Sequence, residues 1–328
     1  MSKLSALRNK VLLQHLFRLR DRMMLRFGLF EFKKTIKRKL FYLRIIIEDW
    51  TKKRKIERQI KLLPINMIGQ DFNDSDIVVS LTSYGARVAD TLPLVLYTLL
   101  TQTIKPGKIV VYLDKINWSD EKLPNILRHL QKVGVDIRYC EDIRSYKKII
   151  PALSDFPNNP IVTVDDDFYY DVHMLEWLLN AYQGLPRKSV VGLWACIVAP
   201  KEGEYLPYNT WVDCKFKTND SKFALYTGYG TFYPPHIFDD EVSNSDIFMK
   251  LCPTADDIWM WVMEQRLNIP VFLAPNAAIG LHTEINRVHV YFPEQNKDSL
   301  YYVNELVGNQ NDTQFKNLIS YYNLHPTE

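Results

Sequence analysis

Cysteine is scarce in this 328-residue sequence. The four cysteines, Cys140, Cys196, Cys214 and Cys252, are far apart, and no two of them form a CxxC pair. This spacing argues against a zinc knuckle and against a dense disulfide framework. It fits a reducing cytoplasm, and we expect the protein there.

Long apolar runs are also absent. No stretch approaches the roughly 18 or more uncharged apolar residues that cross a bilayer. The start of the chain lacks the short apolar core and the small-residue cleavage site of a secretory signal. We therefore expect neither a membrane span nor secretion.

Asp and Glu are rare in the first part of the chain. Residues 1–61 hold 19 Lys and Arg against 5 Asp and Glu, a net charge of +14, whereas the remaining residues hold 22 against 33, a net charge of −11. Apolar residues recur at helical spacing among these basic residues. The pattern predicts one or more amphipathic helices with a cationic face.

This basic segment is compatible with an anionic membrane surface, with nucleic acid, or with a solvated helical appendage. Apolar side chains interleaved with Lys and Arg are typical of an interfacial helix, where each near-surface cation adds about 1 kcal/mol. No zinc-finger or RNA-recognition signature accompanies the charge. We expect residues 1–61 to bind the cytoplasmic face of a membrane peripherally, and we expect no nucleic-acid partner.

A predicted domain boundary follows the basic segment. Pro64, Gly69 and the polar run at 70–76 interrupt the helical pattern. We predict a basic amphipathic segment at 1–70, a catalytic domain at 71–303 and a C-terminal tail at 304–328. The tail is too polar to suggest a role, and no internal repeat is visible.

Strand and helix patterns alternate from residue 77 onward. The predicted strands are Ile77–Leu81, Lys108–Leu113, Val135–Tyr139 and Pro160–Val164, and the predicted helices are Ala89–Thr103, Asp120–Lys132 and Asp256–Leu267. A βαβαβ opening predicts an α/β fold with a mostly parallel sheet and helices on both faces. In such folds the ligand site lies beyond the carboxyl ends of the strands.

Three aspartates, Asp165, Asp166 and Asp167, directly follow the predicted strand at 160–164. Alternation along an extended chain makes Asp165 and Asp167 point the same way. Two such carboxylates suit Mg²⁺ or Mn²⁺, with substrate phosphates completing the shell. The structural alternative is a solvated acidic turn, but adjacent carboxylates repel one another and are costly without a cation or a basic partner.

With these motifs the sequence resembles the glycosyltransferases of the GT-A fold over residues 77–289. The aspartate run looks like their DxD-type motif, and Gly228-Tyr229-Gly230 looks like their glycine-containing acceptor-side loop. Asp256 and Asp257 look like the acidic motif in which inverting members place a general base, and His282 like the histidine that completes the metal site. The resemblance implies a Rossmann-like nucleotide-binding half and a nucleotide-sugar donor, which Asp165 and Asp166 would help to bind.

The runs 164–167 and 255–258 look most like the exostosin-type transferases, which retain the anomeric configuration. In that case Asp257 would position the acceptor or stabilise positive charge on the sugar. In an inverting enzyme it would take the proton of the acceptor hydroxyl. Both roles stay open, as does a structural one, because acidic residues also cap helix starts.

Trp259 and His282 have two interpretations each. Trp259 is either a core residue or an acceptor-side platform on which a sugar ring stacks. His282 is either a metal ligand, as the resemblance implies, or a structural histidine.

Polar residues at the predicted strand ends are candidates for nucleotide contact. Hydroxyls, aromatic faces, a carboxylate and cations near strand ends suit a base, a ribose and a diphosphate, although such residues are equally often structural or solvated. The candidates are Thr82, Ser83, Tyr84, Arg87, Asp114, Arg144, Lys147 and Lys148.

We predict a metal-dependent hexosyl- or N-acetylhexosaminyltransferase that uses a UDP-sugar and a glycan or lipid-linked acceptor in polysaccharide biosynthesis. One rival is a Mg²⁺-dependent aspartyl-phosphate phosphohydrolase, because Asp165-x-Asp167 after an apolar strand also suits a phosphate-accepting nucleophile. That motif usually stands near the start of its domain, whereas about ninety residues precede it here. The other rival is a non-catalytic membrane scaffold, which metal binding would discriminate.

Overall fold

The computed structural model describes residues 36–69, 71–73, 76–186, 188–198, 200–214, 223–275, 283–287, 304 and 309–326. Contacts divide the chain into two compact units, Met1–Lys52 and Lys53–Glu328. Within the described residues no helix is both long and apolar enough to cross a membrane. The predicted domain limits at residues 70 and 303 stay predictions.

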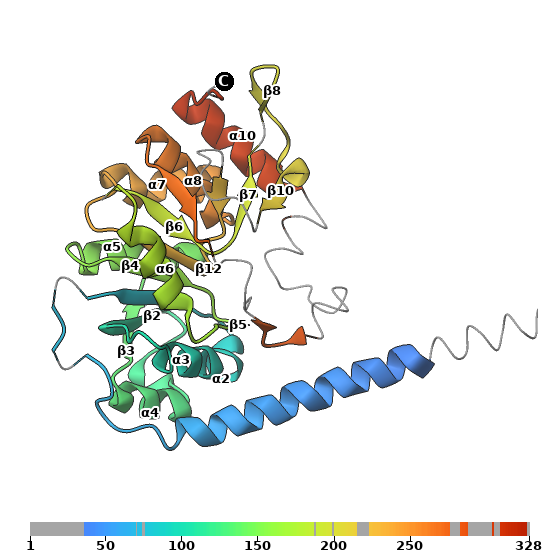
Figure 1. Ribbon diagram of the computed structural model, residues 1–328, viewed down its shortest axis with the longest axis vertical. Helices are drawn as coiled ribbons and strands as arrows, with labels where there is room; N and C mark the ends of the chain where they lie inside the picture. Colours follow the sequence, from blue (N-terminus) through green and yellow to red (C-terminus); the bar gives the residue numbers. More distant parts are fainter. Residues whose placement is uncertain are drawn as a thin grey trace, which may run out of the picture. The chain divides into compact units, whose positions relative to one another are not determined.

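A helix spans residues 36–60 in the basic segment (Figure 1). Its last two turns belong to the second unit, where Ile56 and Ile60 are buried in the main hydrophobic core. The backbone oxygen of Ile60 lies 2.9 Å from Nε2 of His129. These contacts pack the end of the helix, from residue 53 onward, against the rest of the second unit.

A seven-stranded sheet forms the centre of the second unit, in the order β13-β6-β12-β4-β1-β2-β3. β12 pairs antiparallel with both of its neighbours, and the other pairs are parallel. All strands except β12 therefore run in one direction. The strands are β1 (Val78–Thr82), β2 (Lys108–Asp114), β3 (Asp136–Cys140), β4 (Ile161–Val164), β6 (Val190–Gly192), β12 (Tyr229–Tyr233) and β13 (Val271–Leu273).

Helices cover both faces of this sheet. Side chains of β1 alternate between two cores: Val79 and Leu81 belong to the core that contains α3 (Leu92–Leu100) and α4 (Asn125–Val133). Val78 belongs to a separate core with Ala152 of α5 (Ile150–Asp155). Because both faces are buried, most positions of β1 and β2 are apolar. The predicted α/β fold, with a mostly parallel sheet between helices, is confirmed.

Proline explains where two predicted helices differ from the observed ones. The helix predicted at 89–103 is divided into α2 (Arg87–Asp90) and α3, and Pro93 lies in the first turn of α3. Proline suits a first turn, where its missing N–H is not needed. The helix predicted at 120–132 is likewise divided by Pro124 into the 3₁₀ helix η1 (Asp120–Lys122) and α4.

The remaining helices lie around the second half of the sheet, except the 3₁₀ helix η2 (Arg144–Lys148), which contacts β1 and β2. In Figure 1, α7, α8 and α10 lie together, and α10 contacts both α7 and α8. The predicted helix at 256–267 corresponds closely to α8. The helices around the second half are α6 (Met174–Gln183), η3 (Tyr208–Thr210), η4 (Asp240–Ser243), α7 (Ser245–Leu251), α8 (Asp256–Arg266) and α10 (Gln310–Tyr322).

Short strands complete the second half. β7, β10 and β11 form a three-stranded sheet, while β5 pairs with β14 and β8 with β9. The strands are β5 (Phe168–Tyr169), β7 (Ala195–Ile197), β8 (Pro200–Lys201), β9 (Glu204–Tyr205), β10 (Val212–Cys214), β11 (Phe223–Leu225) and β14 (Thr283–Glu284).

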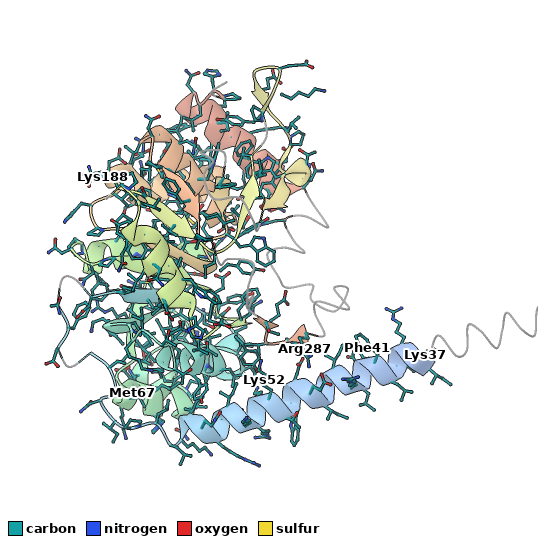
Figure 2. All side chains as sticks on the ribbon, in the orientation of Figure 1. Lys37, Phe41, Lys52, Met67, Lys188 and Arg287 are labelled. Atoms are coloured by element: carbon teal, nitrogen blue, oxygen red, sulfur yellow. The ribbon has the colours of Figure 1, made fainter. Side chains whose placement is uncertain are left out.

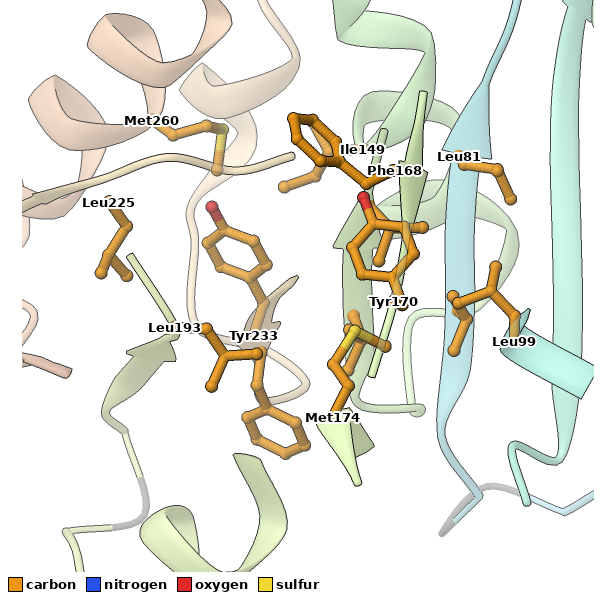
Figure 3. Close-up of a cluster of buried hydrophobic side chains, with 14 of the residues drawn as sticks. Leu81, Leu99, Ile149, Phe168, Tyr170, Met174, Leu193, Leu225, Tyr233 and Met260 are labelled. Carbon is orange, nitrogen blue, oxygen red and sulfur yellow. The ribbon is translucent and has the colours of Figure 1, made fainter. Parts of the chain in front are cut away.

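One hydrophobic core connects the two halves of the unit. Figure 3 shows part of it, with Leu81 and Leu99 from the first half and Tyr233 and Met260 from the second. Tyr170, which follows β5, is also part of this cluster. The aspartates between β4 and β5 are thus anchored on both sides by buried apolar residues.

Candidate active site

The order of the strands reverses beside β1, because β2 and β3 lie on one side of it and β4 on the other. In parallel sheets ligands bind outside the carboxyl ends of the strands at such a switch point. Here the loop after β1 carries Ser83, and the loop after β4 carries Asp165, Asp166 and Asp167, which we call the strand-end aspartates. The topology therefore brings the predicted residues of the two loops together.

Ser83 and Arg87 bind the strand-end aspartates directly. Ser83 Oγ donates to Oδ2 of Asp166 at 2.5 Å, and Nη1 of Arg87 lies 2.8 Å from Oδ1 of the same residue. The same Arg87 nitrogen lies 2.8 Å from Oδ2 of Asp167. Although burial opposes the charged guanidinium, these carboxylates raise the pKa of Arg87. Arg87 stays charged and neutralises part of the cluster.

The three strand-end aspartates differ in exposure. Asp166 is buried and both of its oxygens are hydrogen-bonded, which makes it a structural anchor. The side chains of Asp165 and Asp167 are 38% and 34% exposed. The two outer carboxylates are therefore the accessible ones, as the predicted alternation requires.

Asp167 is the least compensated of the three. Its Oδ1 is buried and has no hydrogen-bond partner among the described residues. Burial, together with the charges of Asp166 and Asp165, raises the pKa of Asp167 to about 7 despite the opposing effect of Arg87. Burial raises the pKa of Asp166 as well, against Arg87 and Ser83. More negative charge is gathered here than the nearby cations balance.

A second acidic pair, Asp256 and Asp257, begins α8, and we call these residues the helix-start aspartates. Oγ1 of Thr227 lies 3.0 Å from Oδ2 of Asp256 and 2.5 Å from Oδ1 of Asp257, close enough to donate to either, and the Thr227 N–H donates to Oδ1 of Asp257 at 2.8 Å. The residue at the N-cap is Ala255, and no side chain caps this helix. The alternative in which an acidic residue caps the helix is therefore not observed.

The helix-start aspartates also divide into a buried and an accessible member. Asp256 is buried, and the neighbouring Lys148 outweighs the effect of burial and lowers the pKa of Asp256. Asp257 is partly exposed, and burial together with the charge of Asp256 raises its pKa to about 7. A carboxyl with a pKa near 7 is suited to accept a proton at neutral pH.

Gly228 lies against the strand-end aspartates, and Thr227 before it binds the helix-start aspartates. The Asp165 N–H donates to the backbone oxygen of Gly228 at 3.0 Å, and the Tyr170 hydroxyl donates to the same oxygen at 2.5 Å. A Cβ atom on Gly228 would lie 1.7 Å from Oδ2 of Asp165, so any other residue there would displace this carboxylate or the backbone. The predicted glycine loop is thus part of the site.

The other two residues of that loop shape the following strand. Tyr229 begins β12. The centroid of its ring lies 4.6 Å from that of Phe168 and 4.3 Å from that of Trp194. Gly230 has φ of 98° at a register shift in β12. Residues with side chains rarely adopt this conformation.

The segment near His282 also reaches the site. His282 itself lies outside the described residues. The adjacent β14 pairs antiparallel with β5, so that the Ile285 N–H donates to the backbone oxygen of Asp167 at 2.8 Å. Burial raises the pKa of Glu284, the second residue of β14, and its charge contributes to the raised pKa of Asp167.

The described residues offer only a small set of ligands for a divalent cation. The described residues contain no group of three or more His, Cys, Asp or Glu side chains that could hold a metal ion. Mg²⁺ is often bound by one or two carboxylates, with substrate phosphates supplying further oxygens. The accessible carboxylates of Asp165 and Asp167 match that smaller set, and Oδ1 of Asp167 has no partner within the described part of the chain.

The other candidates near the ends of β1 and β2 contact neighbouring protein groups. The hydroxyl of Thr82 donates to the backbone oxygen of Tyr112 at 2.8 Å. Tyr84 is 46% exposed, and the Arg87 guanidinium lies 5.2 Å from its ring centre. Oδ1 of Asp114 accepts from Asn117, which fixes the loop after β2. For Thr82, Tyr84 and Asp114, nucleotide contact stays a prediction.

The predicted cations of η2 have other partners. Arg144 donates to the backbone oxygen of Pro253 at 3.3 Å, and the buried Lys147 pairs with Asp142. Lys148 is only 4% exposed and pairs with Asp165 and Asp256. Its burial leaves Lys148 little surface for the diphosphate contact that we considered.

Trp259 lies in the core. It is fully buried, and its indole N–H donates to the backbone oxygen of Val242 at 3.0 Å. Of the two interpretations, the structure agrees with the core residue, because a buried ring leaves no face on which a sugar can stack.

Sequence reasoning missed three contributors to the site: Thr227, Tyr170 and Glu284. Thr227 was detectable only through its position before Gly228, and Tyr170 only through its position after the strand-end aspartates. Glu284 gave no signal, because its approach depends on the pairing of two short, distant strands.

Comparisons with known proteins give a similarity at the level of the fold. No family model and no curated protein matches the sequence. Similar solved structures include a fragment of S. aureus TarS, with 14% identity, TM-score 0.37, and coverage of 75% of this chain and 80% of that one. Another is a putative nucleotide-diphospho-sugar transferase from Desulfovibrio desulfuricans G20, with 12% identity, TM-score 0.36, and coverage of 76% and 99%.

A third similar structure is CMP:2-keto-3-deoxy-manno-octonic acid synthetase with CTP, with 10% identity, TM-score 0.37, and coverage of 61% of this chain and 89% of that one. Identities and TM-scores this low assign neither a substrate nor a reaction to the present chain. The narrower resemblance to exostosin-type transferases stays a prediction.

Proposed function

We propose that this protein is a metal-dependent glycosyltransferase that moves a sugar from a nucleotide-sugar donor, a UDP-sugar, to a hydroxyl of a glycan or lipid-linked acceptor. One observation carries the proposal: two acidic groups, the strand-end and the helix-start aspartates, converge on Lys148. Each group has an accessible aspartate whose pKa is raised to about 7. Two such carboxylates can serve the two ends of a transfer reaction.

The strand-end aspartates are suited to the diphosphate end. They contact one guanidinium, that of Arg87, and one carboxylate oxygen has no hydrogen-bond partner among the residues that the structure describes. Asp165 and Asp167 would hold Mn²⁺ or Mg²⁺ together with the diphosphate. When bound, the cation would offset the negative charge that grows on the departing nucleoside diphosphate.

Asp257 is suited to the acceptor end. In the proposed transfer the acceptor oxygen forms a bond to the anomeric carbon, while the bond from that carbon to the diphosphate breaks and its electron pair leaves with the nucleotide. Asp257 would take the proton of the acceptor hydroxyl. The partial exposure of Asp257 and its pKa of about 7 support this role.

The test is release of nucleotide from a panel of nucleotide sugars by the full-length protein. We expect UDP release from one UDP-sugar with Mn²⁺, loss of release with EDTA, and loss in Asp167→Asn. The matched control is Asp246→Asn, which changes an exposed aspartate at the start of α7. Hydrolysis of a phosphomonoester without cleavage of any nucleotide sugar would instead establish the phosphohydrolase.

We also propose that the helix at 36–60 binds the anionic cytoplasmic face of a membrane and makes the enzyme peripheral. Exposed apolar residues recur along one stripe of this helix at spacings of three and four residues, namely Ile36, Leu40, Leu43, Ile47 and Trp50. Residues 36–61 carry ten Lys and Arg against three Asp and Glu. Figure 2 shows Lys37, Phe41 and Lys52 projecting from this helix.

Charge favours a membrane over a second copy of the helix as the partner of the stripe. Two helices with this excess of Lys and Arg repel each other, whereas anionic lipid attracts each cation by about 1 kcal/mol. A lipid-linked acceptor would be presented at the same surface.

Flotation of the full-length protein with vesicles tests the attachment. We expect binding to phosphatidylcholine vesicles that contain phosphatidylglycerol, weaker binding to pure phosphatidylcholine, and loss of binding in the double variant Leu43→Glu, Ile47→Glu. Leu62→Glu, at a residue 82% exposed beyond the end of the helix, is the control. A stable dimer that this double variant dissociates, without vesicle binding, would contradict the proposal.

A further inference from the structure

Lys148 is a buried cation between the two acidic groups. Its Nζ lies 2.8 Å from Oδ1 of Asp165 and 2.9 Å from Oδ2 of Asp256, and its side chain is 4% exposed. Burial opposes its charge, but the carboxylates of Asp165, Asp256 and Asp257 outweigh burial and raise the pKa of Lys148 well above its usual value. Lys148 is therefore a charged residue with almost no solvent contact.

The geometry points to Lys148 as the positioning residue that fixes the helix-start aspartates at a set distance from the strand-end aspartates. The inference rests on the proposed function and deepens it by naming what aligns its two ends. One ammonium group reaches a carboxylate that follows β4 and a carboxylate at the first residue of α8.

The surrounding contacts show that η2, the 3₁₀ helix that contains Lys148, holds the start of α8. The Tyr146 hydroxyl donates to the backbone oxygen of Cys252 at 2.5 Å, and its ring stacks on Phe248 at 4.1 Å. Arg144 donates to the backbone oxygen of Pro253 at 3.3 Å. Contacts from three residues of one short helix, Arg144, Tyr146 and Lys148, thus fix the chain from Cys252 to Asp256.

Thr227 transmits the position of Asp256 to its accessible neighbour. Its hydroxyl lies within hydrogen-bonding distance of both Asp256 and Asp257. The next residue, Gly228, accepts the backbone hydrogen bond of Asp165. Two connections therefore join the acidic groups, one through the Lys148 side chain and one through the backbone at 227–228. Only the first places a positive charge between carboxylates that would otherwise repel each other.

Two variants separate a positioning role from a merely structural one. Lys148→Met removes the charge at similar size, and Lys148→Arg keeps the charge. Lys108→Met is the control, because Lys108 also pairs with an aspartate, Asp136, at the far side of the sheet from α8. We expect Lys148→Met to lower kcat for sugar transfer about 100-fold, as misplacement by about 1 Å can do. Lys148→Arg restores part of this loss.

The affinity for UDP with Mn²⁺ should change less than about threefold in Lys148→Met, because Lys148 has little surface to offer the donor. A purely structural role predicts a lower Tm with an unchanged kcat per folded molecule, and that result would overturn the inference. So would a large loss of UDP affinity with kcat retained.

Hydrogen exchange gives a readout that does not depend on the proposed activity. Amide exchange in the peptide 252–260 should rise in Lys148→Met but stay near the wild-type rate in Lys148→Arg and Lys108→Met. If the wild-type protein cleaves no nucleotide sugar, the proposed function fails, and the exchange experiment still decides whether Lys148 holds the start of α8. Unchanged exchange in Lys148→Met contradicts the inference.

Discussion

In both the strand-end and the helix-start aspartates, neighbouring carboxylates repel each other. A different cation offsets this repulsion at the buried aspartate of each group. In each group one aspartate is buried and neutralised by a cation and a hydroxyl: Asp166 by Arg87 and Ser83, and Asp256 by Lys148 and Thr227. In each group the next aspartate is accessible and has a pKa raised to about 7.

The cations differ in what they connect. Nη1 of Arg87 binds Asp166 and Asp167 within one group, whereas Lys148 joins Asp165 of one group to Asp256 of the other. Arg87 therefore shapes a single group, and Lys148 relates the two groups to each other. The comparison teaches that the buried aspartates, Asp166 and Asp256, are structural and that the accessible ones, Asp165, Asp167 and Asp257, are the chemical candidates.

The largest expected effect is that of Asp167→Asn. The substitution keeps the shape but removes the negative charge proposed to hold the cation and the diphosphate. We expect kcat for sugar transfer to fall about 100- to 1,000-fold, the cost of losing a preorganised electrostatic group. Steady-state kinetics with saturating Mn²⁺ measures this, and Asp246→Asn should keep the wild-type rate. A loss that higher Mn²⁺ fully restores would show that the charge serves metal affinity only.

Asp257→Asn is expected to lower kcat for transfer about 100-fold, because the amide cannot take a proton. Its amide oxygen can still accept the hydrogen bonds that Thr227 donates, so the start of α8 should keep its geometry. UDP affinity measured with Mn²⁺ should stay within about threefold of the wild type. An equal loss of UDP affinity in this variant and in Asp167→Asn would abolish the division of roles between the two groups.

The pH dependence sharpens the same contrast. Because the Asp257 carboxyl has a pKa of about 7, transfer should rise as pH passes through about 7, and the rise should disappear in Asp257→Asn. A carboxyl whose pKa is raised on folding adds stability while protonated, fully below its ordinary pKa, and this contribution is lost as pH rises through its folded pKa. Asp257→Asn should therefore stabilise the fold at pH 8 but not at pH 4, as thermal unfolding would measure.

Gly228→Ala is expected to have a smaller effect. The added methyl would lie 1.7 Å from Oδ2 of Asp165, so that the carboxylate or the backbone must move. Overpacking of this kind costs about 1–3 kcal/mol of folding stability. We expect a lower Tm and about a tenfold lower kcat. Gly184→Ala, at a position with open space around it, is the matched control. Equal behaviour of the two variants would contradict the close packing of Gly228.

Ser83→Ala should have the smallest effect of these. The variant removes one hydrogen bond to Asp166 while Arg87 remains, which costs about 1–3 kcal/mol when a charged acceptor loses its donor. Turnover should fall only a few-fold, because Asp166 is not one of the accessible aspartates. A loss as large as that of Asp167→Asn would make Asp166 a direct participant.

Much of the fold follows from patterns that the sequence displays openly. The strands β1, β2 and β4 are short apolar runs bounded by polar residues, and each lies within one residue of its prediction at either end. The divided helices were missed because proline inside a helical pattern also permits a helix to begin there. The C-terminal tail is too polar for its sequence to suggest a role, yet Phe315 and Leu318 of α10 are buried.

The site was predictable in its residues but less so in its contacts. Three adjacent aspartates after an apolar strand predicted the strand-end group. Ser83 and Arg87 were predicted to contact the nucleotide, and their hydrogen bonds to Asp166 were not predicted. The sequence offered no means to predict that Lys148 would turn inward to bridge Asp165 and Asp256 while its neighbour Lys147 paired with Asp142. That choice depends on how η2 packs between β1 and α8, which only the three-dimensional structure defines.

Calorimetric titration of UDP into the full-length protein tests the central claim most directly. The account predicts binding in the presence of Mn²⁺, loss of that binding with EDTA and in Asp167→Asn, and retention in Asp257→Asn and Asp246→Asn. No binding of UDP by the wild-type protein with Mn²⁺, or binding that is indifferent to both the metal and Asp167, would contradict it.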